Sequence, residues 1–171
     1  MAGTANGSAR ERFQTLLAAH ERIVFKVAGM YCRHPEDRRD LAQEIAVQAW
    51  RAFGKYDPAR AFSTWLYRIG LNVAISQARS AGVRERHAVP LDEQTHDIAD
   101  ERTSAHEADE RVRALHRCID ALGPLDRALM LLYLDERSHA EIAEVLGISA
   151  SNVATRINRL KQRIRAGLSE Q

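Results

Sequence analysis

The amino-acid sequence predicts an all-α protein made of two small helical domains, which a flexible acidic linker joins. Apolar residues recur at steps of three and four along most of the chain, which is the period of an amphipathic helix, whereas no segment shows strand alternation. With 45% hydrophobic and 28% charged residues, the composition is that of a globular protein and excludes wholesale disorder. A length of 171 residues leaves room for one ordinary domain or two small ones.

The N-terminal domain is expected over residues 11–80, after a disordered tail at residues 1–10. A first helix is predicted from Arg12 to Cys32. Pro35 and the two acidic residues after it favour the start of a second helix, which ends near Gly54. The sequence Asp57-Pro58 then breaks the chain. A third helix is predicted over residues 61–79, with its apolar stripe on one face.

A linker is expected over residues 81–103, where apolar periodicity is low and acidic residues cluster. The C-terminal domain follows at residues 104–171. Its first helices are predicted over residues 105–122 and 125–134, with a break at Gly123-Pro124. Ser138 and Glu141 fit a capping box at the start of a short helix, and Gly147 suits the end of that helix.

Charges are segregated along the chain. Residues 1–80 carry a net charge of +5 and residues 111–171 of +3, while residues 81–110 between them carry −6. Arginine provides 22 of the 25 positive charges, and its planar guanidinium group suits phosphates and base edges. This pattern favours a polyanionic partner, although an arginine bias in the genome composition explains the enrichment equally well.

The last two helices form the most informative motif. A short helix at residues 140–146, a turn at Gly147 and a long final helix without acidic residues between Leu146 and Ser169 predict a helix-turn-helix, whose second helix enters the DNA major groove. Asparagine and arginine side chains pair with base edges, and Arg156 and Arg163 are expected at phosphates. The candidate contacts are Ser151, Asn152, Thr155, Arg156, Asn158, Arg159 and Arg163. An ordinary helical hairpin with a basic solvated face is the alternative.

The segment YLDERSHAEIAEVLGISASNVATRINRLKQRIR, within residues 125–168, resembles region 4 of the bacterial RNA polymerase sigma factors of the extracytoplasmic-function (ECF) class. The segments DRRDLAQEIAVQAWRAF (residues 37–53) and YDPARAFSTWLYRIGLNVAI (residues 56–75) resemble region 2 of the same family. The order of the two modules is also that of the family. The resemblance therefore covers nearly everything except the N-terminal tail and the linker.

The resemblance implies a transcription initiation factor that directs core RNA polymerase to specific promoters and helps to open the DNA. The implied partners are the β′ coiled coil and the β flap of the polymerase, promoter DNA and, in many members, an anti-sigma factor. Positions that match the helix docking on the β′ subunit are Asp37, Asp40, Leu41, Gln43, Glu44 and Trp50. A plain core helix explains Leu41 and Trp50 equally well, and Arg39 replaces an acidic residue that is usual in the family.

The resemblance also assigns a stretch that recognises and opens the minus-ten promoter element. Its candidate residues are Tyr56, Phe62, Trp65, Arg68, Asn72 and Arg79. Unpaired bases stack on aromatic rings and arginine follows the backbone, so these residue types suit single-stranded DNA. Trp65 shares the stripe of Phe62, however, and this favours a core position for it. In region 4, Ser151, Thr155, Asn158 and Arg159 match positions that face the minus-thirty-five element, and Ala154 replaces a basic residue that is common there.

Other function classes fit the sequence less well. An enzyme is not expected, because no Gly-rich phosphate loop, G-x-S-x-G elbow or suggestive carboxylate pair occurs. No cofactor or metal is expected, because Cys32 and His34, or His116 and Cys118, lie two apart and do not share a helix face. A helix-turn-helix regulator that binds duplex DNA without core polymerase explains residues 111–171 equally well, but not the basic helical domain before them. An adaptor without DNA contact is a third possibility.

The sequence also bears on localisation. No stretch approaches the roughly 18 uninterrupted apolar residues of a membrane helix, and the N-terminus lacks the apolar core of a signal peptide. We therefore expect a cytoplasmic protein without membrane insertion. Cys32 and Cys118 are expected to be reduced packing residues rather than a disulfide.

Overall fold

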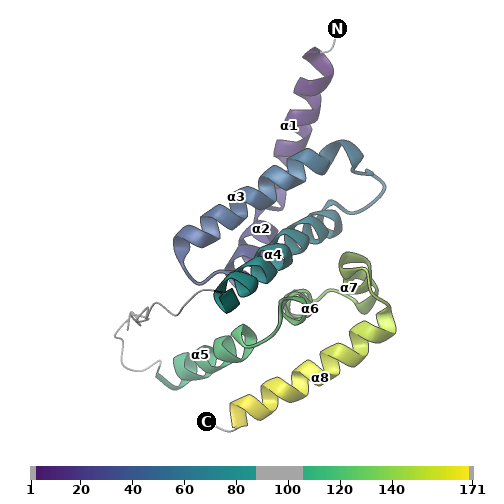
Figure 1. Cartoon of the computed structure of the whole chain (residues 1–171). Helices are drawn as coiled ribbons and strands as arrows, with labels where there is room; N and C mark the ends of the chain where they lie inside the picture. The colour runs from purple at the N-terminus through teal and green to yellow at the C-terminus, as the bar shows by residue number, and fades with distance from the viewer. Residues whose placement is uncertain (1–2, 88–105, 170–171) are drawn as a thin grey trace.

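The computed structural model describes residues 3–87 and 106–169. These residues form helices and no strand, which confirms the all-α prediction. The elements are α1 (Gly3–Ala19), α2 (Glu21–Tyr31), α3 (Pro35–Ala52), the 3-10 turn η1 (Phe53–Lys55), α4 (Phe62–His87), α5 (His106–Asp120), α6 (Pro124–Leu134), α7 (His139–Leu146) and α8 (Ala150–Ser169). We refer to α1–α4 as the N-terminal module and to α5–α8 as the C-terminal module (Figure 1).

The observed helix boundaries differ from the predicted ones in the N-terminal module. The single helix predicted from Arg12 to Cys32 is two helices, α1 and α2, which meet at His20. A break of one residue leaves the spacing of the apolar residues almost unchanged, so periodicity did not reveal it. Helix α1 also begins at Gly3, inside the tail that was predicted to be disordered.

The boundary at the expected linker also differs. Helix α4 continues to His87, beyond the predicted end at residue 79 and into the segment assigned to the linker. The apolar stripe stops earlier, but no proline lies between residue 79 and Pro90, so no helix-breaking residue ends the helix at residue 79. The remainder of the predicted linker, residues 88–103, lies outside the described residues.

The C-terminal module contains the predicted helix-turn-helix. The backbone N–H of Glu141 donates to Ser138 Oγ at 3.2 Å, and the backbone N–H of Ser138 donates to Glu141 Oε2 at 2.8 Å, which confirms the capping box. Gly147 ends α7 with φ = 68°, a left-handed conformation that favours glycine. The stripe of α8 is buried at Val153, Ile157, Leu160 and Ile164.

The two modules pack against each other, and α6 lies between them. Figure 1 shows α6 end-on, between α4 of the N-terminal module and α8 of the C-terminal module. Five consecutive residues of α6, from Ala128 to Leu132, are buried. Five consecutive residues point to all sides of a helix, so this stretch of α6 is enclosed all round. Apolar side chains of both modules therefore belong to one continuous core.

Candidate functional site

The outward face of α8 presents five of the seven residues predicted to contact the minus-thirty-five element. Ser151, Asn152, Thr155, Asn158 and Arg159 are all exposed, opposite the buried stripe of the helix. Ser149 precedes α8, and its Oγ accepts a hydrogen bond from the backbone N–H of Asn152 at 3.2 Å. The polar groups therefore follow a capped helix start, where backbone N–H groups and the helix dipole favour an anion such as phosphate.

The other two residues of that set, Arg156 and Arg163, are turned toward α6. Nη1 of Arg156 lies 3.5 Å from Asp126 Oδ1, and Nη1 of Arg163 lies 3.9 Å from Asp126 Oδ2. The side chain of Arg156 is 37% exposed, and its Nη1 is buried without a hydrogen bond. The structure thus places the Arg156 guanidinium group against the module itself, whereas it was predicted to reach a DNA phosphate. The side chain of Arg163 is 59% exposed and keeps access to solvent.

Aromatic side chains gather where η1 meets α4, in the region predicted to bind the minus-ten element. The ring of Trp65 lies 5.1 Å from those of Tyr56 and Phe62, measured between centroids. The hydroxyl of Tyr56 donates to the backbone oxygen of Arg60 at 2.7 Å and holds the loop before α4. Tyr56 and Trp65 are half-buried, but Phe62 is only 5% exposed. Phe62 is therefore a core residue here, and its ring is not available for stacking with a base.

The polar candidates of α4 lie on its surface. Arg68, Asn72 and Arg79 are exposed and share one side of the helix, since they are four and seven residues apart. Asn72 lines a groove of about 480 Å³ between α3 and α4, with Glu44, Gln48 and Ser76. This surface offers two guanidinium groups and an amide, and Arg68 lies one turn beyond Trp65 of the aromatic cluster.

The candidate polymerase-docking residues of α3 divide into exposed and buried ones. Asp37, Asp40 and Gln43 are exposed, and Trp50 is 38% exposed, with its ring 5.2 Å from that of Phe13. Glu44 is half-buried and accepts a hydrogen bond from Gln48 Nε2 at 2.6 Å. Leu41 is only 2% exposed and belongs to the core. An outside partner would therefore meet the polar residues and the Trp50 ring, but not Leu41.

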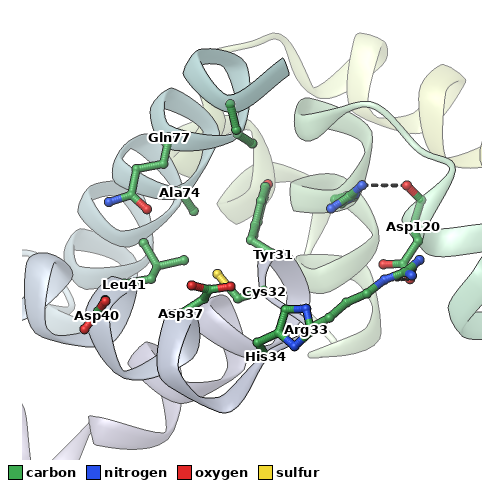
Figure 2. A pocket seen from close by; sticks show the side chains of 13 residues that line it. Tyr31, Cys32, Arg33, His34, Asp37, Asp40, Leu41, Ala74, Gln77 and Asp120 are labelled. Atoms are coloured by element: carbon green, nitrogen blue, oxygen red, sulfur yellow. Dashed lines mark hydrogen bonds and ion pairs between the residues drawn. The ribbon is translucent and has the colours of Figure 1, made fainter. Parts of the chain in front are cut away.

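A pocket of about 710 Å³ lies between the two modules (Figure 2). Tyr31 stands in it between Leu41 and Ala74 on one side and Asp120 on the other, and its hydroxyl donates to the backbone oxygen of Pro124 at 2.6 Å. Burial raises the pKa of Tyr31 far above its usual value, against the opposing charge of Arg127, so its hydroxyl stays protonated.

Both cysteines are free and half-buried, and both pack against the core. This confirms the interpretation of Cys32 and Cys118 as packing residues. Cys32 lines the pocket between the modules, where burial, followed by the negative charge of Asp37, raises the pKa of its thiol. The thiol is therefore a poor nucleophile near neutral pH.

Two further features escaped the sequence reasoning. Phe25 is 61% exposed and lines an apolar groove of about 300 Å³ with Leu17, Val24 and Ala42. In the sequence, Phe25 is distinguished only by its position outside the buried stripe of α2. A single exposed aromatic residue is common at protein surfaces, so this position alone did not indicate a site. The second feature joins Lys26, Tyr67 and Asp135 across the module boundary, and no local pattern indicates that contact.

None of the helices in the described part of the chain combines the length and apolar character needed to cross a membrane. Within residues 3–87 and 106–169, no cluster of three or more histidine, cysteine, aspartate or glutamate side chains is arranged to hold a metal ion.

Comparison with known proteins identifies both modules. Residues 16–84 match the family model for sigma-70 region 2, and residues 112–164 match the model for sigma-70 region 4. The RNA polymerase sigma factor CnrH of Cupriavidus metallidurans is 30% identical, over 96% of this chain and 90% of its own length. The ECF RNA polymerase sigma factor SigE of Mycolicibacterium smegmatis is 28% identical over 98% of this chain, which spans 65% of the SigE length.

Solved structures show the same arrangement of helices. The structure of CnrH in complex with the cytosolic domain of CnrY superposes with a TM-score of 0.66 at 26% identity, covering 95% of this chain and 90% of that chain. The sigma factor RpoE of Bartonella quintana, in complex with the anti-sigma factor NepR, has a TM-score of 0.70 at 17% identity, covering 93% of this chain and 98% of that chain, and shares the fold. With its helix-turn-helix, its two matched regions and these relatives, the chain belongs to the ECF class of sigma-70 family RNA polymerase sigma factors.

Proposed function

We propose that this chain, as a sigma factor, initiates transcription by reading two promoter elements with two separate surfaces while it is bound to core RNA polymerase. The single observation that carries the proposal is the helix-turn-helix with an exposed, acid-free polar face, preceded by a second helical module with its own exposed basic surface. We assign the first reading surface to residues 11–80 and the second to residues 104–171.

The minus-thirty-five element is assigned to α8. Ser151, Asn152, Thr155, Asn158 and Arg159 are the exposed residues of its outward face, and asparagine and arginine each pair with a base edge in the major groove. Arg163, at the rim, contacts a phosphate. Arg156 keeps α8 in place on α6 through Asp126, so it positions the recognition helix instead of binding DNA.

The minus-ten element is assigned to the surface of α4 and the loop before it. Arg68, Asn72 and Arg79 provide contacts to the backbone and to a base edge, and the half-buried rings of Tyr56 and Trp65 provide an edge for an unpaired base. Phe62 supports these rings from the core, with its centroid 5.4 Å from that of Tyr56.

Core polymerase is assigned to α3. Asp37, Asp40, Gln43 and Trp50 form an exposed surface with both polar and aromatic character, which suits docking on the β′ coiled coil. Glu44 borders this surface, and Leu41 supports it from inside. The C-terminal module contacts the β flap.

The remaining partners follow from the same proposal. The chain contributes no bond chemistry and requires no cofactor, because its role is to bind the polymerase and the promoter. An anti-sigma factor is a further partner, since the CnrH and RpoE structures contain CnrY and NepR respectively. The chain acts in the cytoplasm, where the polymerase works.

The test is run-off transcription with core RNA polymerase and a library of promoter fragments. Start sites that require the chain, share two spaced upstream elements and weaken with Arg159→Ala would support the proposal. Arg22→Ala, an exposed arginine of α2, is the matched control and leaves these start sites unchanged. If the chain retards duplex DNA in a gel but never binds core polymerase, the proposal is wrong and the chain is a helix-turn-helix regulator.

A further inference from the structure

The contact between the two modules is centred on the carboxylate of Asp135, which directly follows α6. Its Oδ1 accepts a hydrogen bond from Lys26 Nζ of α2, and its Oδ2 accepts one from the hydroxyl of Tyr67 of α4 at 2.8 Å. Arg137 Nε lies 3.4 Å from the same Oδ2. One side chain of the C-terminal module therefore binds two helices of the N-terminal module at once.

This junction is more buried than the two ion pairs that Arg33 and Arg60 form between the modules. Asp135 is 17% exposed and Tyr67 is fully buried. By contrast, the ion pairs of Arg33 with Asp120 and of Arg60 with Glu144 are largely solvent-exposed, and pairs of that kind contribute little to stability.

The charge of Asp135 is stabilised in this arrangement. Burial by itself raises the pKa of its carboxyl group, but the hydrogen bonds from Lys26 and Tyr67 and the charges of Lys26 and Arg137 outweigh burial, so the pKa is lowered. The guanidinium carbon of Arg137 also lies 5.3 Å from the centre of the Tyr67 ring. The junction is thus an ionised carboxylate with cationic and hydroxyl partners on several sides.

The packed chain is smaller than the distance between the two promoter elements that it is proposed to contact. Elements centred at positions minus thirty-five and minus ten are about 25 base pairs apart, which is about 85 Å of duplex at about 3.4 Å per base pair. A compact chain of 171 residues has a radius of gyration of about 15 Å and hence a diameter of about 40 Å. The reading faces of α4 and α8 are both exposed, but the packed modules cannot reach both elements of a straight duplex.

We propose that the Asp135 junction is a latch that holds the free chain in a closed form, unable to contact both promoter elements, and that the modules must separate before the promoter is read. This inference rests on the proposed function for its meaning, but the latch itself is a property of the free chain. Because neither reading face is covered, the closed form can still bind one element alone. Both elements are read together only after binding to core polymerase has broken the Asp135 contacts and separated the modules.

The test measures module separation without polymerase or DNA. Donor and acceptor dyes are placed at Ala59→Cys and Ala140→Cys, in a chain that also carries Cys32→Ser and Cys118→Ser. Both labelled positions are exposed and neighbour the Arg60–Glu144 pair, so energy transfer is high in the closed form. Asp135→Asn removes the charge with little change of shape, and Glu136→Gln, the exposed neighbouring acid, is the matched control.

We expect the labelled parent chain to be mainly closed and Asp135→Asn to raise the ratio of open to closed chains about tenfold, which corresponds to about 1.4 kcal/mol. Tyr67→Phe, which deletes only the hydroxyl, changes the ratio in the same direction, and Glu136→Gln leaves it unchanged. Circular dichroism verifies that each variant is folded. A parent chain that is mainly open, or an Asp135→Asn chain with the energy transfer of the parent, overturns the latch.

A second measurement separates the latch from the proposed function. If only the open form binds core polymerase, the apparent affinity rises with the open fraction, so Asp135→Asn needs about tenfold less chain for half-maximal transcription. If Asp135→Asn opens the chain but the chain never supports transcription, the latch proposal stands and the proposed function is refuted. A chain that supports transcription, but whose module separation does not respond to Asp135→Asn, refutes the latch alone.

Discussion

Arg156 and Arg159 lie on the same turn of α8 but have different surroundings. Replacing each with alanine is therefore expected to affect a different property of the chain. Arg156 is half-buried beside Asp126, 3.5 Å away, whereas Arg159 is exposed on the outward face. Arg156→Ala should therefore lower the stability of the chain. Arg159→Ala should instead lower promoter-specific transcription.

The magnitudes follow from these surroundings. A partly exposed ion pair contributes about 0.2–1 kcal/mol, and the lost packing of the Arg156 stem adds to it, so Arg156→Ala costs about 1 kcal/mol of unfolding free energy. For a chain of this size, such a loss lowers the unfolding midpoint by about 2–4 °C. A specific base contact is worth about 1–3 kcal/mol, so Arg159→Ala reduces initiation by about 5- to 150-fold.

The assays are thermal unfolding followed by circular dichroism, and run-off transcription at limiting concentrations of the chain, corrected for the folded fraction. Asp126→Asn serves as the partner variant, because it should lower the midpoint as Arg156→Ala does. The reasoning is refuted if Arg156→Ala leaves the midpoint unchanged while it reduces transcription as strongly as Arg159→Ala.

Three further predictions concern the turn, the cap and the polymerase-docking helix. Gly147→Ala should cost about 1–2 kcal/mol in urea unfolding, because an L side chain is strained at φ = 68° although nothing lies within 4 Å of the new Cβ; an unchanged midpoint would contradict this. Hydrogen bonds from Ser138 lower the pKa of Glu141 in the folded chain, so its contribution to stability is present above the unfolded pKa of about 4.3 and is lost as the pH falls through the folded pKa. Glu141→Gln should therefore lose stability at pH 7 and show a smaller decrease on acidification to pH 3, and the reasoning fails if both chains respond equally to acid. Asp40→Ala should weaken binding to core polymerase with the unfolding midpoint unchanged, whereas Leu41→Ala, in the core, should cost about 2–5 kcal/mol of stability; an Asp40→Ala chain that binds core polymerase as tightly as the parent would exclude a docking role for Asp40.

Local chemistry was sufficient to predict much of the C-terminal module. The capping box at Ser138 and Glu141 and the left-handed Gly147 are determined by neighbouring residues, so they could be located before any packing was known. The stripe of α8 was equally visible, because burial on one helix face leaves a regular period. The break at His20 was invisible for the same reason, since it leaves that period intact.

The candidate site was only partly predictable. Residue types that suit DNA were found at Arg68, Asn72 and Arg159, but type alone does not reveal which guanidinium group is already engaged. Arg156 differs from Arg159 only in its angle around α8, and that angle matters because Asp126 lies beside it. Phe62 and Leu41 show the same limit, because an aromatic or aliphatic residue fits both a core and an interface.

The sequence by itself determined the two helical modules, the helix-turn-helix and the membership in a family of sigma factors, because periodicity, caps and turn residues are local properties. Only the tertiary structure showed that α6 is buried between the modules and that Asp135 joins Lys26 and Tyr67 across them. Those contacts connect residues 109 and 68 positions apart along the chain. No local pattern encodes such a pairing, because it depends on how whole helices pack.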